Sequence, residues 1–97
     1  MTSKHDTTAD RLARKEGVEY NRSQGPDVKS TRRAIEVETT ETVQDGFRQL
    51  QGFNKPVYIA GADAAATKAA LEAAKGTTVG VMNSQGQIVK RSTRKRR

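Results

Sequence analysis

Two carboxylates in this chain stand at a spacing that can bring them together. Gly25-Pro26-Asp27 is followed after eight residues by Glu36-Val37-Glu38, in a stretch that predicts two short strands. A symmetric reversal about Thr31 and Arg32 makes Asp27 and Glu36 cross-strand partners. Opposed Cβ atoms lie about 4.5 to 5.5 Å apart, and like charges so placed destabilise the pair. A divalent cation between the two acids would offset that repulsion.

The alternation of a strand decides which side chains share a face with these acids. A period of two places Glu38 beside Glu36 and Lys29 beside Asp27. Three apolar residues then point the other way into a core: Val28, Ile35 and Val37. An ordinary solvated face is the alternative, with Glu38 paired with Arg33 or Lys29.

Two facing acids on a rigid hairpin suit magnesium chemistry. Mg²⁺ prefers oxygen ligands and needs only one or two carboxylates. Such an ion can promote phosphodiester hydrolysis by activating water and neutralising charge on phosphate oxygens. Glu38 could then ligate a second ion or orient water. Lys29 is the nearest cation for the phosphate, and Arg48, on the polar side of a following helix, is a second candidate.

The elements that position these residues alternate between helix and strand. We expect a helix from Thr7 or Thr8 to Glu16, a strand at 18–20, a turn at 23–26, the acidic hairpin at 27–38, a helix at 41–51, a strand at 56–60, a helix capped by Asp63 and ending near Lys75, and a hairpin of 78–82 with 87–89. This order predicts an α/β fold, a central mixed sheet flanked by helices.

The same order, with Pro26-Asp27 and Glu36-x-Glu38, resembles the PD-(D/E)XK nuclease superfamily, in particular its small Holliday-junction-resolvase-like and restriction-endonuclease-like members. The resemblance spans about residues 8–82. It implies a restriction-endonuclease-like fold and hydrolysis of DNA. It also implies that Asp27, Glu36 and the main-chain carbonyl of Val37 hold Mg²⁺ or Mn²⁺. The departure is Glu38, where the family usually has Lys and some restriction enzymes have Glu. A first-helix acid approaches the metal in some relatives, so Glu16 is either such a residue or a solvated helix-end glutamate.

The positive charge is concentrated at the C-terminus. The formal net charge is +7, and six of the 18 Lys and Arg residues lie in 90–97 with no acid among them. These six are Lys90, Arg91, Arg94, Lys95, Arg96 and Arg97. A basic arm on a near-neutral body is typical of phosphate-backbone binding, and a merely solubilising terminus is the alternative. We therefore expect one domain at 1–89 and a flexible basic tail at 90–97 that binds nucleic acid, DNA in the first place.

Several classes of protein are disfavoured by composition. The chain has no cysteine, which excludes disulfides and thiolate metal sites, and no nucleotide fingerprint. No segment has the pattern of a signal peptide or a membrane span, so we expect a cytoplasmic protein without a membrane partner. His5, in a polar terminus without other His or Cys, is expected to have no role as ligand or catalyst.

Three functions are compatible with the sequence. The first is a magnesium-dependent nuclease acting on DNA, and the second is a non-catalytic nucleic-acid-binding protein that keeps the fold without the family's Lys. The third is an α/β module whose tail binds an acidic protein. The sequence leaves open whether two subunits pair as a homodimer.

Overall fold

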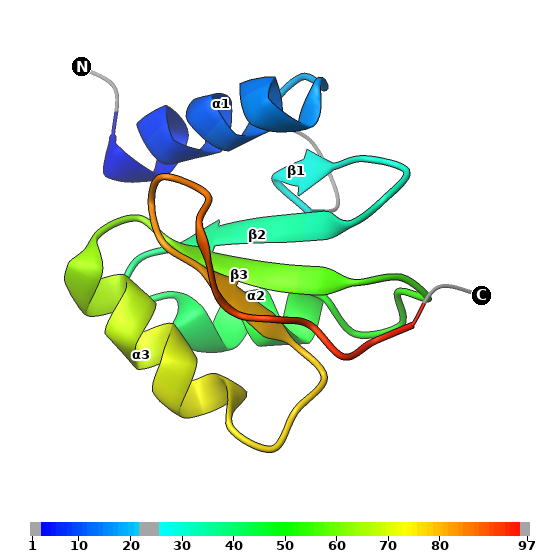
Figure 1. Cartoon of the computed structure of the whole chain (residues 1–97). Helices are drawn as coiled ribbons and strands as arrows, with labels where there is room; N and C mark the ends of the chain where they lie inside the picture. Colours follow the sequence, from blue (N-terminus) through cyan, green and yellow to red (C-terminus); the bar gives the residue numbers. More distant parts are fainter. Residues whose placement is uncertain (1–2, 22–25, 96–97) are drawn as a thin grey trace.

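The computed structural model describes residues 3–21 and 26–95. Their elements are α1 (Lys4–Glu16), β1 (Val28–Lys29), β2 (Ala34–Glu38), α2 (Val43–Gln49), β3 (Val57–Gly61), α3 (Ala64–Ala74), β4 (Gly80–Met82) and β5 (Ile88–Lys90). These strands form one five-stranded sheet in chain order, with antiparallel outer pairs and parallel inner pairs. The expected α/β fold with a mixed sheet is confirmed (Figure 1).

Helices cover both faces of this sheet. One core cluster joins α1 to one face, and the other joins α2 and α3 to the opposite face. Strand β2 supplies both clusters by alternation, since Ile35 and Val37 face α1 whereas Ala34 faces α2 and α3. Glu36 and Glu38 share the face of Ala34, so they lie on the side of the sheet that α2 covers.

The helix ends follow local capping chemistry. Helix α1 begins earlier than expected because the Ser3 hydroxyl accepts a hydrogen bond from the Asp6 amide, and it ends at Gly17, whose φ is 74°. Asp63 caps α3 as expected. Helix α2 is shorter than the predicted 41–51, because residues 39–42 form a turn in which the Thr42 amide donates to the Thr39 carbonyl.

The strand expected at 18–20 is absent from the structure. The Val18 amide is used at the end of α1, where it donates to the Ala13 carbonyl. Val18 and Tyr20 still pack against the core beside α1, which accounts for the alternating pattern without a strand. The backbone amide of Asn21 then donates a hydrogen bond to the Asp27 carbonyl. Apart from Pro26, the predicted turn at 23–26 lies outside the described residues.

The C-terminal segment lies against the body of the protein up to residue 95. Lys90, which we assigned to the tail, belongs to β5, so the expected boundary at residue 90 falls inside a strand. Gly80 in β4 permits the C-terminal segment to pass close to its backbone, since a Cβ at this position would lie 2.6 Å from the Lys90 carbonyl oxygen. Further along, Arg94 Nη1 donates to the Leu50 carbonyl at 2.6 Å. Among the described residues, no helix has the length and apolar character that crossing a membrane requires.

Candidate functional site

The acidic hairpin has the register that the sequence predicted. Lys29 pairs with Ala34 and Val28 with Ile35 across the two strands. Continuing this register places Asp27 opposite Glu36. One ligand oxygen from each of Asp27, Glu36 and Glu38 lies within 4.8 Å of the others. We call these three residues the acidic cluster.

The acidic cluster is not the solvated face that we weighed as an alternative. Glu36 is 3% exposed and Glu38 is 5% exposed, because α2 covers this side of the sheet. Gly46 on α2 provides the space, since a Cβ there would lie 2.7 Å from Glu38 Cγ and 2.7 Å from Ile59 Cδ1. The glycine that weakens the helix locally is therefore required where the helix crosses Glu38.

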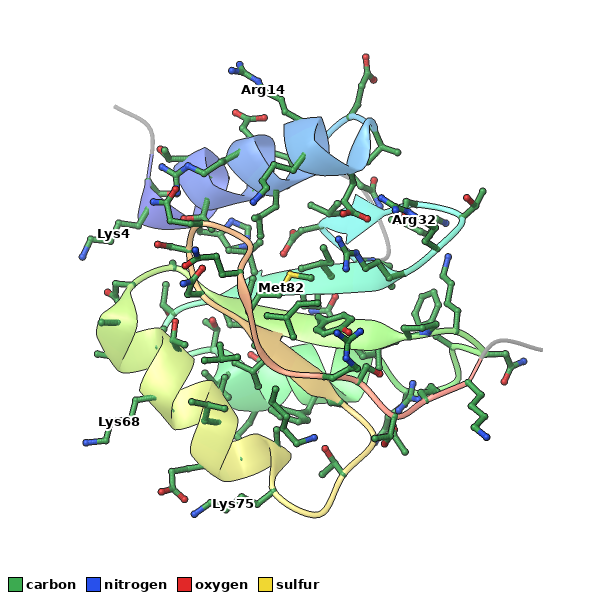
Figure 2. The ribbon with its side chains drawn as sticks, in the orientation of Figure 1. Lys4, Arg14, Arg32, Lys68, Lys75 and Met82 are labelled. Atoms are coloured by element: carbon green, nitrogen blue, oxygen red, sulfur yellow. The ribbon has the colours of Figure 1, made fainter. Side chains whose placement is uncertain are left out.

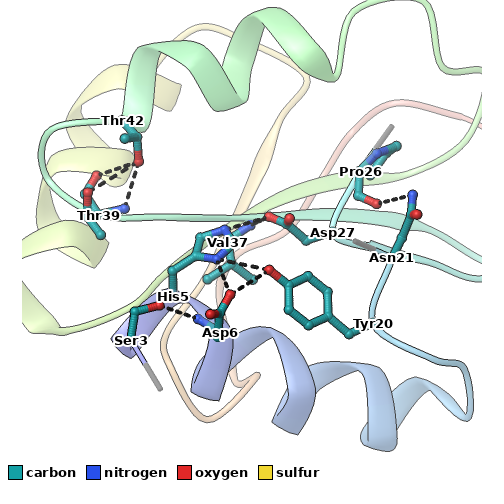
Figure 3. A network of polar contacts seen from close by, with 10 residues as sticks. All are labelled: Ser3, His5, Asp6, Tyr20, Asn21, Pro26, Asp27, Val37, Thr39 and Thr42. Atoms are coloured by element: carbon teal, nitrogen blue, oxygen red, sulfur yellow. Dashed lines mark hydrogen bonds and ion pairs between the residues drawn. The ribbon is translucent and has the colours of Figure 1, made fainter. Parts of the chain in front are cut away.

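Asp27 is held at the edge of the sheet by two contacts on one oxygen. Its Oδ2 accepts from the Val37 amide at 2.9 Å and lies 3.1 Å from His5 Nε2 (Figure 3). The Val37 carbonyl points to the same side as the Val37 amide, because the N–H and C=O groups of one strand residue point toward the same neighbouring strand. The side chain of Asp27 is 14% exposed, so the cluster meets solvent at this residue.

Burial and crowding keep Glu36 protonated. Desolvation, a hydrogen bond with Asp27 and the charges of Asp27 and Glu38 raise the pKa of Glu36 to about 9. Its Oε2 is buried and makes no hydrogen bond to any residue that the structure describes. An orphaned buried oxygen costs about 1 to 3 kcal/mol. A cation at this position would displace the proton and satisfy that oxygen.

Glu38 has a pKa suited to proton transfer near neutral pH. Burial raises it to about 7, opposed mainly by a hydrogen bond from Thr42. The negative charge of Asp27 raises it further, and His5 lowers it. The Thr42 hydroxyl also accepts a hydrogen bond from the Thr39 amide (Figure 3). The turn before α2 therefore fixes the orientation of the Glu38 carboxyl group.

His5 is the residue that the sequence analysis missed. Because α1 begins early, the His5 ring lies between Asp27 and the pair formed by Asp6 and Tyr20 (Figure 3). The Tyr20 hydroxyl donates to Asp6 Oδ1 at 2.9 Å and lies 3.2 Å from His5 Nδ1. Tyr20 and His5 hold the pKa of Asp6 below its usual range. The signal available in the sequence was Ser3 three residues before Asp6, which is a helix-start pattern.

The remaining candidates near the site have other partners or lie in solvent. Glu16 neither reaches the acidic cluster nor is solvated: its side chain is 4% exposed and binds Arg33, so Arg33 does not pair with Glu38. Arg48 is exposed on α2 and pairs with Asp45 at 2.6 Å. Lys29 is exposed in β1, and its role toward a phosphate stays a prediction.

The basic C-terminal residues are placed unequally. Lys90 Nζ donates to the Val79 carbonyl at 2.6 Å, and Arg94 is anchored at Leu50. Arg91 and Lys95 are exposed. Arg96 and Arg97 lie outside the described residues. Two of the six side chains expected to bind nucleic acid are therefore engaged within the protein.

Comparisons of this chain with family models, with curated proteins and with solved structures found no match. The resemblance to the nuclease superfamily consequently rests on the residues of the acidic hairpin and on the order of elements around them.

Proposed function

We propose that this protein is a magnesium- or manganese-dependent nuclease of the PD-(D/E)XK type that acts on DNA. The observation that carries the proposal is the acidic cluster. One oxygen from each of its three carboxyl groups lies within 4.8 Å of the others, and a buried Glu36 oxygen has no hydrogen-bond partner in residues 3–21 and 26–95. In proteins generally, buried carboxylates are paired or bind metal ions. The oxygen-only donor set is the one that Mg²⁺ and Mn²⁺ prefer.

The element order supports the family assignment with one departure. Helix α1, the acidic hairpin, α2 and the parallel strand β3 follow one another as in that superfamily. The hairpin has two strands where the family has a three-stranded meander, because residues 18–20 form no strand. The restriction-endonuclease-like assignment therefore rests on the part of the sheet that carries Asp27 and Glu36.

Each residue of the cluster receives a distinct role in this proposal. Asp27, Glu36 and the Val37 carbonyl would hold the ion, which when bound supplies an activated water and neutralises phosphate charge. Glu38, with a pKa of about 7, can accept a proton at neutral pH in place of the family's Lys. His5 fixes the orientation of Asp27 through Oδ2.

A non-catalytic DNA-binding protein is the second candidate. It is favoured by Glu38 at the position of the usual Lys and by the burial of Glu36 and Glu38 beneath α2. Such a protein would bind the ion or the DNA without cleaving a phosphodiester.

Cleavage of labelled DNA separates the two candidates. Wild type, Asp27→Asn, Glu36→Gln and Glu38→Lys are incubated with duplex, branched and single-stranded DNA in Mg²⁺ or Mn²⁺. The exposed Glu72→Gln on α3 is the matched control. Nuclease function predicts cleavage by wild type and the control, and loss of at least a hundredfold in the Asp27 and Glu36 variants.

Two other results have definite meanings. If only Glu38→Lys cleaves, the DNA-binding candidate is correct and the catalytic one is wrong for the natural chain. If no variant cleaves any substrate, the nuclease proposal fails.

A further inference from the structure

A second charged site lies at the other end of the strands that carry the acidic cluster. A small cavity of about 180 Å³ is bounded there by Arg32, Arg33, Pro56, Tyr58 and Arg91. These residues come from the turn before β2, the start of β3 and the segment after β5. We call them the arginine pocket. The pocket therefore joins parts of the chain that are distant in sequence.

The arginine pocket has an excess of positive charge. Three arginines line it, and in the described part of the chain Glu16 is the acid that contacts two of them: it lies 3.8 Å from Arg32 Nη2 and also binds Arg33. Hydrogen bonding by Arg33 lowers the pKa of Glu16, so this carboxyl group is ionised at neutral pH. One negative charge against three positive charges leaves about two for a ligand.

Arg33 is fixed in place before any ligand arrives. Its Nε and Nη2 donate to the two oxygens of Glu16 in a bidentate pair, and its guanidinium carbon lies 5.7 Å from the centre of the Tyr58 ring. A guanidinium has five N–H donors, so three remain for a ligand. A fixed arginine loses less entropy on binding, and its fork geometry matches phosphate oxygens.

We propose that the arginine pocket binds a phosphate group. The cavity is smaller than the roughly 300 to 1,000 Å³ of pockets for drug-sized ligands, so it suits a compact multivalent anion. That this phosphate belongs to a DNA strand rests on the proposed function; free inorganic phosphate is the other source with the same chemistry.

The arginine pocket and the acidic cluster are connected by α1. His5 lies beside Asp27, and Glu16, at the far end of the same helix, lies beside Arg33. At 1.5 Å per residue these two positions are about 16 Å apart along the helix. A phosphate in the arginine pocket is therefore not the one at the acidic cluster. It is a separate contact that fixes how the strand lies across the protein.

The test uses exposed arginines, so that the fold is preserved. Arg32→Gln/Arg91→Gln removes two charges from the pocket and leaves the Arg33–Glu16 pair intact. Arg14→Gln/Lys68→Gln is the charge-matched control, because these two side chains extend into solvent from α1 and α3 (Figure 2). Binding of a labelled duplex is measured against salt in EDTA, where the acidic cluster has no ion. A failure of the nuclease proposal therefore does not affect this result.

We expect the pocket variant to bind duplex DNA about tenfold more weakly, with a log-log salt slope lower by about 0.9 for each phosphate that it no longer neutralises. The control variant should change affinity less than twofold. Amide spectra recorded with inorganic phosphate should show shifts at residues 32, 33 and 91 in the wild type. Such shifts without a difference in DNA binding between the two variants would assign the pocket to free phosphate and overturn its DNA role. No shifts and equal DNA binding would overturn the site altogether.

Discussion

Metal-free protein should lose stability as pH rises, and Glu36→Gln should remove much of that loss. In the folded protein burial raises the pKa of Glu36 from 4.5 to about 9 and the pKa of Glu38 to about 7. The unfolded chain has ordinary carboxyl pKa values. Folded protein therefore holds more protons than unfolded protein above about pH 4.5. The free energy of unfolding then decreases with rising pH until the folded pKa is passed.

The size of the effect follows from the number of protons released on unfolding. Each such proton lowers the free energy of unfolding by about 1.4 kcal/mol per pH unit. Above about pH 7 Glu36 alone contributes, and below it Glu38 adds a second proton. With an m-value near 1.5 kcal/mol/M in urea, one proton moves the unfolding midpoint by about 1 M per pH unit.

Urea unfolding in EDTA at about pH 5.5, 6.5, 7.5 and 8.5 measures these slopes. Glu36→Gln is neutral at every pH, so its slope should be smaller than that of wild type by about one proton. The exposed Glu72→Gln should keep the wild-type slope. A wild-type midpoint that stays constant or rises over this range would refute the reasoning, as would equal slopes in wild type and Glu36→Gln. Acids whose pKa is lowered, such as Glu16, stay ionised throughout and do not affect the comparison.

Three further predictions concern individual residues and the C-terminus. Gly46→Ala should destabilise the protein by about 1 to 3 kcal/mol in urea unfolding, because its Cβ would lie 2.7 Å from Glu38 Cγ; stabilisation, as helix propensity alone predicts, would show that α2 is not packed on Glu38. His5→Ala should raise the pKa of Glu38 above about 7 in a carboxyl ¹³C titration, since His5 lowers it in the intact protein, and an unchanged value would place His5 away from the cluster. Removal of residues 95–97 should weaken DNA binding and lower the salt slope by about 0.9 for each phosphate that these residues neutralise, whereas an unchanged slope would exclude a role for this end of the chain.

The parts of the fold that follow from local rules were predicted from the sequence. The hairpin register came from symmetry about its turn, and alternation then placed Val28, Ile35 and Val37 in the core. Asp63 as a helix cap is another local signal. The class of fold followed from the order of these elements.

The surroundings of the acidic cluster could not be predicted in the same way. The cover over Glu36 and Glu38 is α2, whose position depends on packing between elements and on the space left by Gly46. A pattern of polar residues also fits a solvated outer face, which was the alternative for this hairpin, and that alternative fails because α2 covers Glu36 and Glu38. His5 meets Asp27 only through the docking of α1, which no spacing in the sequence encodes. Val18 and Tyr20 both pack against the core beside α1, and this packing produces the same alternating apolar pattern as a strand.

The most direct test of the proposed metal site is a titration with Mg²⁺, repeated with Mn²⁺, at about pH 8. Binding is followed by amide chemical shifts and, for Mn²⁺, by paramagnetic broadening. Asp27 and Glu36 as ligands predict saturable changes at residues 27 and 35–38, accompanied by release of a proton from Glu36 and abolished in Glu36→Gln. Unmoved resonances at those residues with millimolar Mg²⁺ and Mn²⁺ would contradict a divalent-cation site at the acidic cluster.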